Sequence, residues 1–144
     1  MSFDKFDISY MKMAHIWAKN SHCKRKQVGV VIVKENTMIS DGFNGTPRGM
    51  DNCCEDSDGE TKWYVIHAEE NAICKLAQST NSARGATMYC TLSPCRECCK
   101  MILMTGIVRV VYDKQHSDTS GLDLLRYANI EVSQLNLDMQ NGQS

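Results

Sequence analysis

An α/β fold, with a mixed sheet covered by helices on both faces, is predicted by three features of the sequence. The chain has 144 residues, which suits one domain with a real core and is too short for two ordinary domains. Two strand-like segments separated by a short polar turn predict an opening hairpin. Beyond them, helical and strand patterns alternate, as in sheets whose parallel strands are joined by right-handed crossovers.

The N-terminal part predicts one helix and the hairpin. In residues 7–20, apolar side chains recur at helical spacing behind Asp7, a possible N-cap. Residues 28–33 are β-branched and compact, and a turn separates them from a second strand at residues 38–43. The next stretch has loop chemistry and then many acids, which we expect to be solvated: Asp51, Glu55, Asp56, Asp58 and Glu60.

The second half alternates helices with strands. The expected elements are a helix from residue 67 to about residue 81, a strand at 86–91, a helix opened by Ser93-Pro94 and stopped by Gly106, a strand at 107–112, a helix at 119–128 and a short strand at 130–133. Residues 1–134 are therefore expected to form a single domain, and residues 135–144 a loose polar C-terminal tail.

Charge and hydropathy argue against several classes of protein. Sixteen Lys and Arg nearly balance seventeen Asp and Glu, so no nucleic-acid or membrane partner is expected. The apolar run at 28–33 is far shorter than the roughly 18 residues of a spanning helix, and the start lacks the blocks of a signal peptide. We expect a cytoplasmic protein, whose eight cysteines are metal ligands, core residues or catalytic groups rather than a disulfide scaffold.

Two predicted helix starts carry a candidate zinc site. The first is His67-Ala68-Glu69, and the second contains Cys95 and Cys98 behind Pro94. Two cysteines three apart at a helix start can face one point, where the positive helix end favours their thiolate forms. One imidazole completes three protein ligands, which leaves a fourth position open, as in catalytic rather than structural zinc sites.

Glu69 completes this constellation as a candidate base. Its spacing of two from His67 does not share one helical face, so it fits a base that reaches a bound water better than a second ligand. The combination of H-x-E with P-C-x-x-C is the known signature of zinc nucleobase deaminases. The alternative is that His67 caps a helix and that Cys95 and Cys98 are buried thiols.

Further segments extend this likeness. The sequence resembles the zinc-dependent cytidine and deoxycytidylate (dCMP) deaminase family, and most of all its phage-type dCMP deaminases, from residue 5 to about residue 130. The zinc motif alone would also fit cytidine, guanine or tRNA adenosine deaminases, whereas the Asn-Gly-x-Pro-x-Gly loop favours deoxycytidylate. The segments that carry the resemblance are Cys23-Lys-Arg-Lys-Gln-Val-Gly29, Gly42-Phe-Asn-Gly-Thr-Pro-Arg-Gly49, His67-Ala-Glu-Glu-Asn-Ala-Ile73 and Ala86-Thr-Met-Tyr-Cys-Thr-Leu-Ser-Pro-Cys-Arg-Glu-Cys98.

The resemblance implies a fold and a chemistry. The fold is cytidine-deaminase-like, with a five-stranded mixed sheet between helices in three layers, in agreement with the elements above. His67, Cys95 and Cys98 hold Zn²⁺, which lowers the pKa of its water from 15.7 to roughly 7. Glu69 takes the proton of that water, passes it to N3 of cytosine and later helps to protonate the departing ammonia.

The resemblance also implies the substrate contacts. The backbone around Ala68 and Ser93 contacts the carbonyl and amino groups of the base. Arg25, within a short basic run, matches the position that binds the monophosphate, although such a run is often a solvated turn. Asn44 matches the asparagine that holds the deoxyribose hydroxyl, although it could also be a left-handed turn residue before Gly45. Tyr112 and His116 align only loosely with the phosphate end, and we do not select them.

Regulation and assembly follow from the same resemblance. It implies activation by dCTP and inhibition by dTTP, with Mg²⁺, in a homohexamer. The regulatory site would be lined by Gly42, Gly45 and Arg48. It leaves open whether Cys23 and Cys53 bind a second zinc, for which His15 or His22 would be further ligands, while Cys74, Cys90 and Cys99 are expected in the core.

The leading hypothesis is therefore a cytoplasmic enzyme that deaminates dCMP to dUMP and so supplies dTTP synthesis. One alternative is a deaminase of another nucleobase, in cytidine, tRNA or single-stranded DNA. The basic groove with stacking side chains that a polymer substrate needs is not evident in the sequence. The other alternative is a zinc-stabilised module without turnover, in which Glu69 would have no use.

Overall fold

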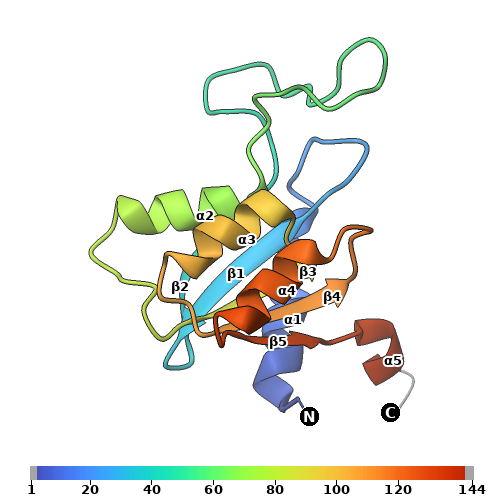
Figure 1. Cartoon of the computed structure of the whole chain (residues 1–144). Helices are drawn as coiled ribbons and strands as arrows, with labels where there is room; N and C mark the ends of the chain where they lie inside the picture. The colour runs from blue at the N-terminus through green and yellow to red at the C-terminus, as the bar shows by residue number, and fades with distance from the viewer. Residues whose placement is uncertain (1–2, 142–144) are drawn as a thin grey trace.

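Five strands form one mixed sheet in the order β2-β1-β3-β4-β5 in the computed structural model, which describes residues 3–141 (Figure 1). β1 pairs antiparallel with β2 and with β3, while β3, β4 and β5 run parallel. The predicted hairpin and the mixed sheet are both confirmed. The strands are β1 (Gly29–Lys34), β2 (Thr37–Phe43), β3 (Thr87–Leu92), β4 (Arg109–Lys114) and β5 (Glu131–Gln134).

The helices cover both faces of the sheet. Along β1, Val30 and Ile32 face the core beneath α2, α3 and α4, whereas Val31 and Val33 face the core shared with α1 and α5. This alternation with a period of two produces the three predicted layers (Figure 1). The helices are α1 (Lys5–Ala18), α2 (Ala68–Ala77), α3 (Arg96–Leu103), α4 (Ser120–Tyr127) and α5 (Leu137–Asn141).

The first helix begins earlier than its sequence pattern suggests. Asp4 is the N-cap, because its Oδ1 accepts a hydrogen bond from the Asp7 backbone N–H at 2.9 Å, and Asp7 Oδ2 accepts one in return from the Asp4 N–H at 3.1 Å. The prediction that Asp7 is the N-cap is therefore wrong. Asp7 lies inside the first turn, where a capping box uses its carboxylate.

The segment after β5 is packed, not loose. Leu135 is fully buried and Leu137 nearly so, in the core shared with α1, and α5 follows. The expectation of a loose tail from residue 135 is wrong as far as residue 141, because two leucines in an otherwise polar stretch are enough to anchor it. Residues 142–144 of that expected tail lie outside the described residues.

A buried carboxylate joins α1 to the sheet. Asp7 Oδ1 accepts hydrogen bonds from the Tyr89 hydroxyl at 2.6 Å and from Arg109 at 2.8 Å, and Arg109 also reaches Asp7 Oδ2 at 3.2 Å. Burial alone would raise the pKa of Asp7, but these hydrogen bonds lower it below its usual value. The ionised form of Asp7 is thus part of the folded structure.

Substitution of Asp7 by Asn should lower the free energy of unfolding by about 3 kcal/mol at pH 7, because it leaves Arg109 without its buried partner. The native pKa of Asp7 is depressed, so its contribution is present above the unfolded pKa and disappears as the pH falls through the native one. Urea unfolding of wild type and Asp7→Asn between pH 7 and pH 2 measures both effects. Asp138→Asn removes an exposed pair with Lys114 and should cost less than about 1 kcal/mol; equal losses in the two variants would contradict this account.

Candidate metal centre and nucleotide cavity

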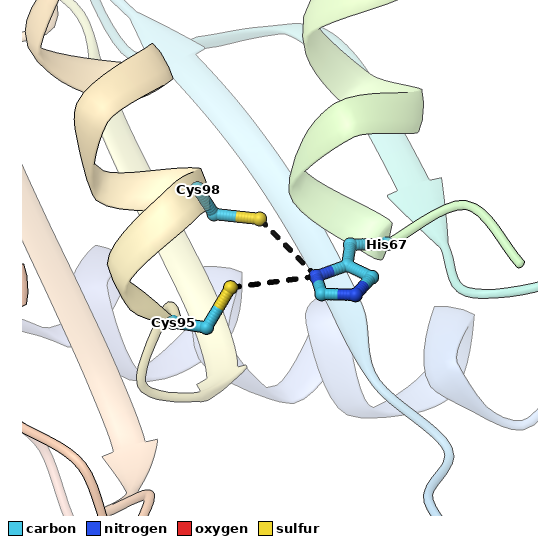
Figure 2. A group of neighbouring side chains, drawn as sticks. All are labelled: His67, Cys95 and Cys98. Carbon is cyan, nitrogen blue, oxygen red and sulfur yellow. Dashed lines mark hydrogen bonds between the residues drawn. The ribbon is translucent and has the colours of Figure 1, made fainter. Parts of the chain in front are cut away.

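The three predicted zinc ligands meet at one point. The Nδ1 atom of His67 lies 3.3 Å from the sulfur of Cys98 and 3.6 Å from the sulfur of Cys95, and all three ligand atoms lie within 4.8 Å of one another. Figure 2 shows both sulfurs directed at this nitrogen. Tetrahedral zinc, with bonds of about 2.3 Å to sulfur and 2.0 Å to nitrogen, places such atoms about 3.5 Å apart. The donor set and its spacing therefore fit Zn²⁺.

Two helix N-termini hold these ligands. His67 is the N-cap of α2, and its backbone N–H donates to the Glu70 carboxylate at 2.8 Å. Cys95 is the N-cap of α3, so that Cys98 lies one turn further along the same helix start. Because α3 follows β3 after only a few residues, the site lies at the carboxyl end of a central strand, where ligands of open α/β sheets usually bind.

The electrostatics of the cluster favour a bound cation. Hydrogen bonds from Cys98 and then from His67 lower the pKa of Cys95 to about 3, so this sulfur is a thiolate. The hydrogen bond to Cys95 raises the pKa of His67 to about 9, and the hydrogen bond to Cys95 together with burial raises the pKa of Cys98. Without metal, the protonated His67 balances the Cys95 thiolate, and Cys98 is a neutral thiol. A divalent cation would displace these protons and take their place.

Glu69 lies beside this cluster and is not one of its ligands. Its side chain is buried, with 4% of the residue exposed, and it lines the same cavity as His67 and Cys95. Burial raises its pKa to about 7. A carboxyl group with a pKa near neutrality can both accept and return a proton, which is the property that a general base and acid needs.

The cavity in front of the ligands has the size of a small-molecule site. Its volume is about 260 Å³, and it contains every predicted catalytic and substrate-binding residue. The basic groups Arg25, Lys26 and His116 belong to its lining together with two of the candidate ligands, His67 and Cys95. Its lining residues include Arg25, Asn44, His67, Ala68, Glu69, Ser93 and Cys95.

Two backbone groups in the cavity suit a flat heterocycle. Ala68 is the first residue of α2, where the N–H lacks an intrahelical acceptor and can donate to a ligand. The N–H of Ser93 donates to the Lys114 carbonyl at 2.8 Å, so of its two backbone groups the carbonyl oxygen is the one that could accept from a ligand. The pair thus presents one donor and one acceptor.

The amide of Asn44 holds the chain before β1. Its Oδ1 accepts from the Val28 N–H at 2.8 Å, and its Nδ2 donates to the Lys26 carbonyl, also at 2.8 Å. Asn44 is not among the described non-glycine residues with positive φ, so the left-handed turn alternative is wrong. Asn44 lines the cavity, but its two amide ends are already used to shape it.

The residues of the basic run before β1 differ in their position relative to the cavity. Arg25 and Lys26 line the cavity, whereas Lys24 is not among its lining residues. The Arg25 guanidinium lies 3.2 Å from the Glu60 carboxylate, with both side chains largely exposed. Such a pair contributes little to stability, so an anionic ligand could replace Glu60 at small cost.

Two further cavity residues were not selected from the sequence. His116 is held over the cavity by its backbone N–H, which donates to Ser93 Oγ at 2.7 Å, and its Nδ1 accepts from the Asp118 N–H at 3.1 Å. In the sequence, only a loose alignment with the phosphate end indicated His116.

Glu55 belongs to the acidic stretch that we expected to be solvated, yet it is 9% exposed and lines the cavity, so for Glu55 that expectation is wrong.

The remaining cysteines differ in part from expectation. Cys23 forms a disulfide with Cys54, and Cys53 instead donates to the Glu55 carbonyl at 3.1 Å. The chain therefore does contain a disulfide, and the sulfur next to Cys23 is not that of Cys53. Cys90 and Cys99 are buried as predicted, whereas Cys74 is exposed on α2.

The predicted regulatory residues lie outside this cavity. A Cβ atom at Gly42 would collide with the Ala68 carbonyl oxygen, so this glycine lets β2 approach the start of α2. Gly45 pairs with Ile66 through two backbone hydrogen bonds, and Arg48 is exposed. Their role towards a nucleotide effector stays a prediction.

Comparison with known proteins agrees with this geometry. Residues 4–114 match the family model of the cytidine and deoxycytidylate deaminase zinc-binding region. The chain belongs to this deaminase family. It is 33% identical over 165 residues to the deoxycytidylate deaminase of Enterobacteria phage T4, which covers 85% of this chain and 86% of the relative. A crystal structure of dCMP deaminase from the cyanophage S-TIM5 in complex with dCMP and dUMP superposes with a TM-score of 0.90 at 40% identity, covering 94% of this chain and all of that one.

Other relatives are longer than this chain. The deoxycytidylate deaminase of Saccharomyces cerevisiae is 37% identical over 139 residues, which are 90% of this chain and 44% of the yeast protein. The chain thus spans less than half the length of that relative. Each helix described between residues 3 and 141 is too short or too polar to span a bilayer.

Substitution of Glu69 by Gln should separate metal binding from chemistry. The amide keeps the size of the side chain but cannot accept the proton, so we expect one zinc per chain, as in wild type, and a loss of deaminase activity of about 10³-fold or more. The Cys98→Ser variant, in contrast, should lose both the bound zinc and the deaminase activity. Zinc content and turnover of the purified variants measure these outcomes, and an active Glu69→Gln enzyme with bound zinc would rule out Glu69 as the base.

Proposed function

We propose that this protein is a zinc-dependent dCMP deaminase, which converts dCMP and water to dUMP and ammonia. The observation that carries the proposal is that one cavity is lined by two ligands of the three-ligand metal site (His67 and Cys95), by the buried Glu69 and by the basic groups Arg25, Lys26 and His116. The likeness to the dCMP-bound phage enzyme supports the choice of substrate.

His67, Cys95 and Cys98 would hold Zn²⁺, which supplies a Lewis acid that makes water nucleophilic at neutral pH. Glu69 accepts the proton that the attacking water loses and delivers it to N3 of the cytosine. The C4–amino bond then breaks, and Glu69 helps to protonate the amine that leaves as ammonia. Oxygen replaces nitrogen at C4, so no oxidant or reductant is needed.

The rest of the cavity orients the nucleotide. The Ala68 N–H donates to the carbonyl oxygen of the base, and the Ser93 carbonyl accepts from its amino group. Arg25, Lys26 and His116 offer positive charge or N–H donors to the 5′-phosphate. His116 is well suited to this, because its backbone and Nδ1 are already fixed and its second ring nitrogen can face a ligand.

Regulation and assembly are further parts of the proposal. We infer that dCTP activates and dTTP inhibits the enzyme, each with Mg²⁺, by binding at the loop that contains Gly45 and Arg48. We also infer that the protein is a homohexamer in the cytoplasm.

Support for self-assembly comes from an exposed apolar groove, which fits a second copy of the chain. Trp63 in this groove is 92% exposed, and the other apolar lining residues are Pro47, Met50, Tyr64, Val65, Ile66 and Met101.

Purified protein with one zinc per chain should release dUMP from dCMP, and faster with dCTP and Mg²⁺ than with dTTP. Loss of cytosine absorbance measures turnover, with cytidine and a cytosine-containing single-stranded oligonucleotide as competing substrates. Turnover of the oligonucleotide alone would favour a polymer deaminase, and no turnover of any substrate would favour a zinc-stabilised module.

We expect Arg25→Ala to raise KM for dCMP by about tenfold or more, because a charged hydrogen bond to phosphate is lost.

A further inference from the structure

Glu55 differs from the other acids around it. It is buried, whereas the remaining carboxylates of the stretch are exposed: Asp51, Asp56, Asp58 and Glu60. Its side chain lines the cavity that contains His67 and Glu69. A buried carboxylate is costly unless it is hydrogen-bonded, so its two oxygens need partners.

Only one of these oxygens has a partner in the described chain. Glu55 Oε2 accepts from the backbone N–H of Lys24 at 3.0 Å and from that of Arg25 at 3.3 Å. These two bonds fix the carboxylate against the turn that carries Arg25. Among the described residues, Oε1 is buried without any hydrogen-bond donor. An unmet acceptor of this kind is destabilising, and a donor from a bound molecule would remove that cost.

Neither Asn44 nor Arg25 donates to Oε1. Both amide ends of Asn44 bond the chain at Lys26 and Val28, and the Arg25 guanidinium pairs with Glu60. Because no donor among the described residues reaches Oε1, a ligand bound in the cavity can supply the missing hydrogen bond.

The chemistry of dCMP leaves one candidate for this donor. Its phosphate is an anion and an acceptor, which a carboxylate repels, and its amino group belongs at the metal end of the cavity. The sugar lies between base and phosphate and carries a single hydroxyl. We propose that Glu55 Oε1 accepts the hydrogen bond of the 3′-hydroxyl, so that Glu55 selects nucleotides carrying this group. This inference rests on the proposed deaminase function.

A second metal ion is the competing occupant. If the disulfide were reduced, the sulfurs of Cys23 and Cys54 would lie within 4.8 Å of a Glu55 oxygen, which is a plausible ligand set. In that arrangement Glu55 would bind the ion and not the sugar. The two interpretations differ in metal content and in dependence on the 3′-hydroxyl.

The test compares kcat/KM for dCMP with kcat/KM for its analogue without the 3′-hydroxyl. The ratio is measured on one preparation, so a partly unfolded variant does not change it. We expect wild type to prefer dCMP by about 10-fold to 100-fold, as for a hydrogen bond to a charged group. In Glu55→Gln the ratio should fall about fivefold, because a neutral bond replaces a charged one, and in Glu55→Met it should approach one. Asp58→Asn, an exposed acid of the same stretch, should keep the wild-type ratio.

Three results would overturn the inference. They are equal use of both substrates by wild type, an unchanged ratio in the Glu55 variants, or a second zinc in reduced wild type that is lost in Glu55→Gln. Absence of dCMP turnover in zinc-loaded wild type would instead overturn the proposed function, and this inference with it.

Discussion

The meeting of two helix N-termini at one edge of the sheet is the constraint on which the rest of the site depends. α2 and α3 bring His67, Cys95 and Cys98 to one point, and their positive ends favour thiolate at this place. The close approach of β2 to α2 at Gly42 and the hydrogen bond from the Asn71 amide to the Phe43 carbonyl hold the start of α2 against the sheet. A shift of either helix would separate the ligands and expose Glu69, whose raised pKa depends on burial.

The polar lining of the cavity follows from the meeting of α2 and α3 at this edge of the sheet. Its lining combines the sulfur of Cys95 and the buried carboxyl group of Glu69 with residues from segments far apart in the chain, the turn at Arg25 and the loop at His116, which add positive charge and N–H donors. Glu55 belongs to the same lining, and its carboxylate anchors the turn at Arg25. In the proposed function, these groups supply both the reacting groups and the orientation of the substrate.

Much of the fold and the metal site could be predicted from the sequence, because both depend on local patterns. Periodicity predicted the strands, and the spacing of Cys95 and Cys98 at a helix start predicted two of the candidate zinc ligands. Glu55 could not be predicted, since its burial depends on backbone N–H groups thirty residues earlier in the chain, and its acidic neighbours suggest solvation. The Cys23–Cys54 disulfide and the packing of Leu135 likewise depend on tertiary contacts that no local pattern encodes. The N-cap at Asp4 was missed because two aspartates three apart both suit that position.

X-ray absorption at the zinc edge of the purified protein tests the central claim most directly. The structure predicts two sulfur ligands at about 2.3 Å, one imidazole nitrogen at about 2.0 Å, and one oxygen from water in the open position. A closed shell of three or four sulfurs, or one with no imidazole, would contradict a catalytic site built from His67, Cys95 and Cys98.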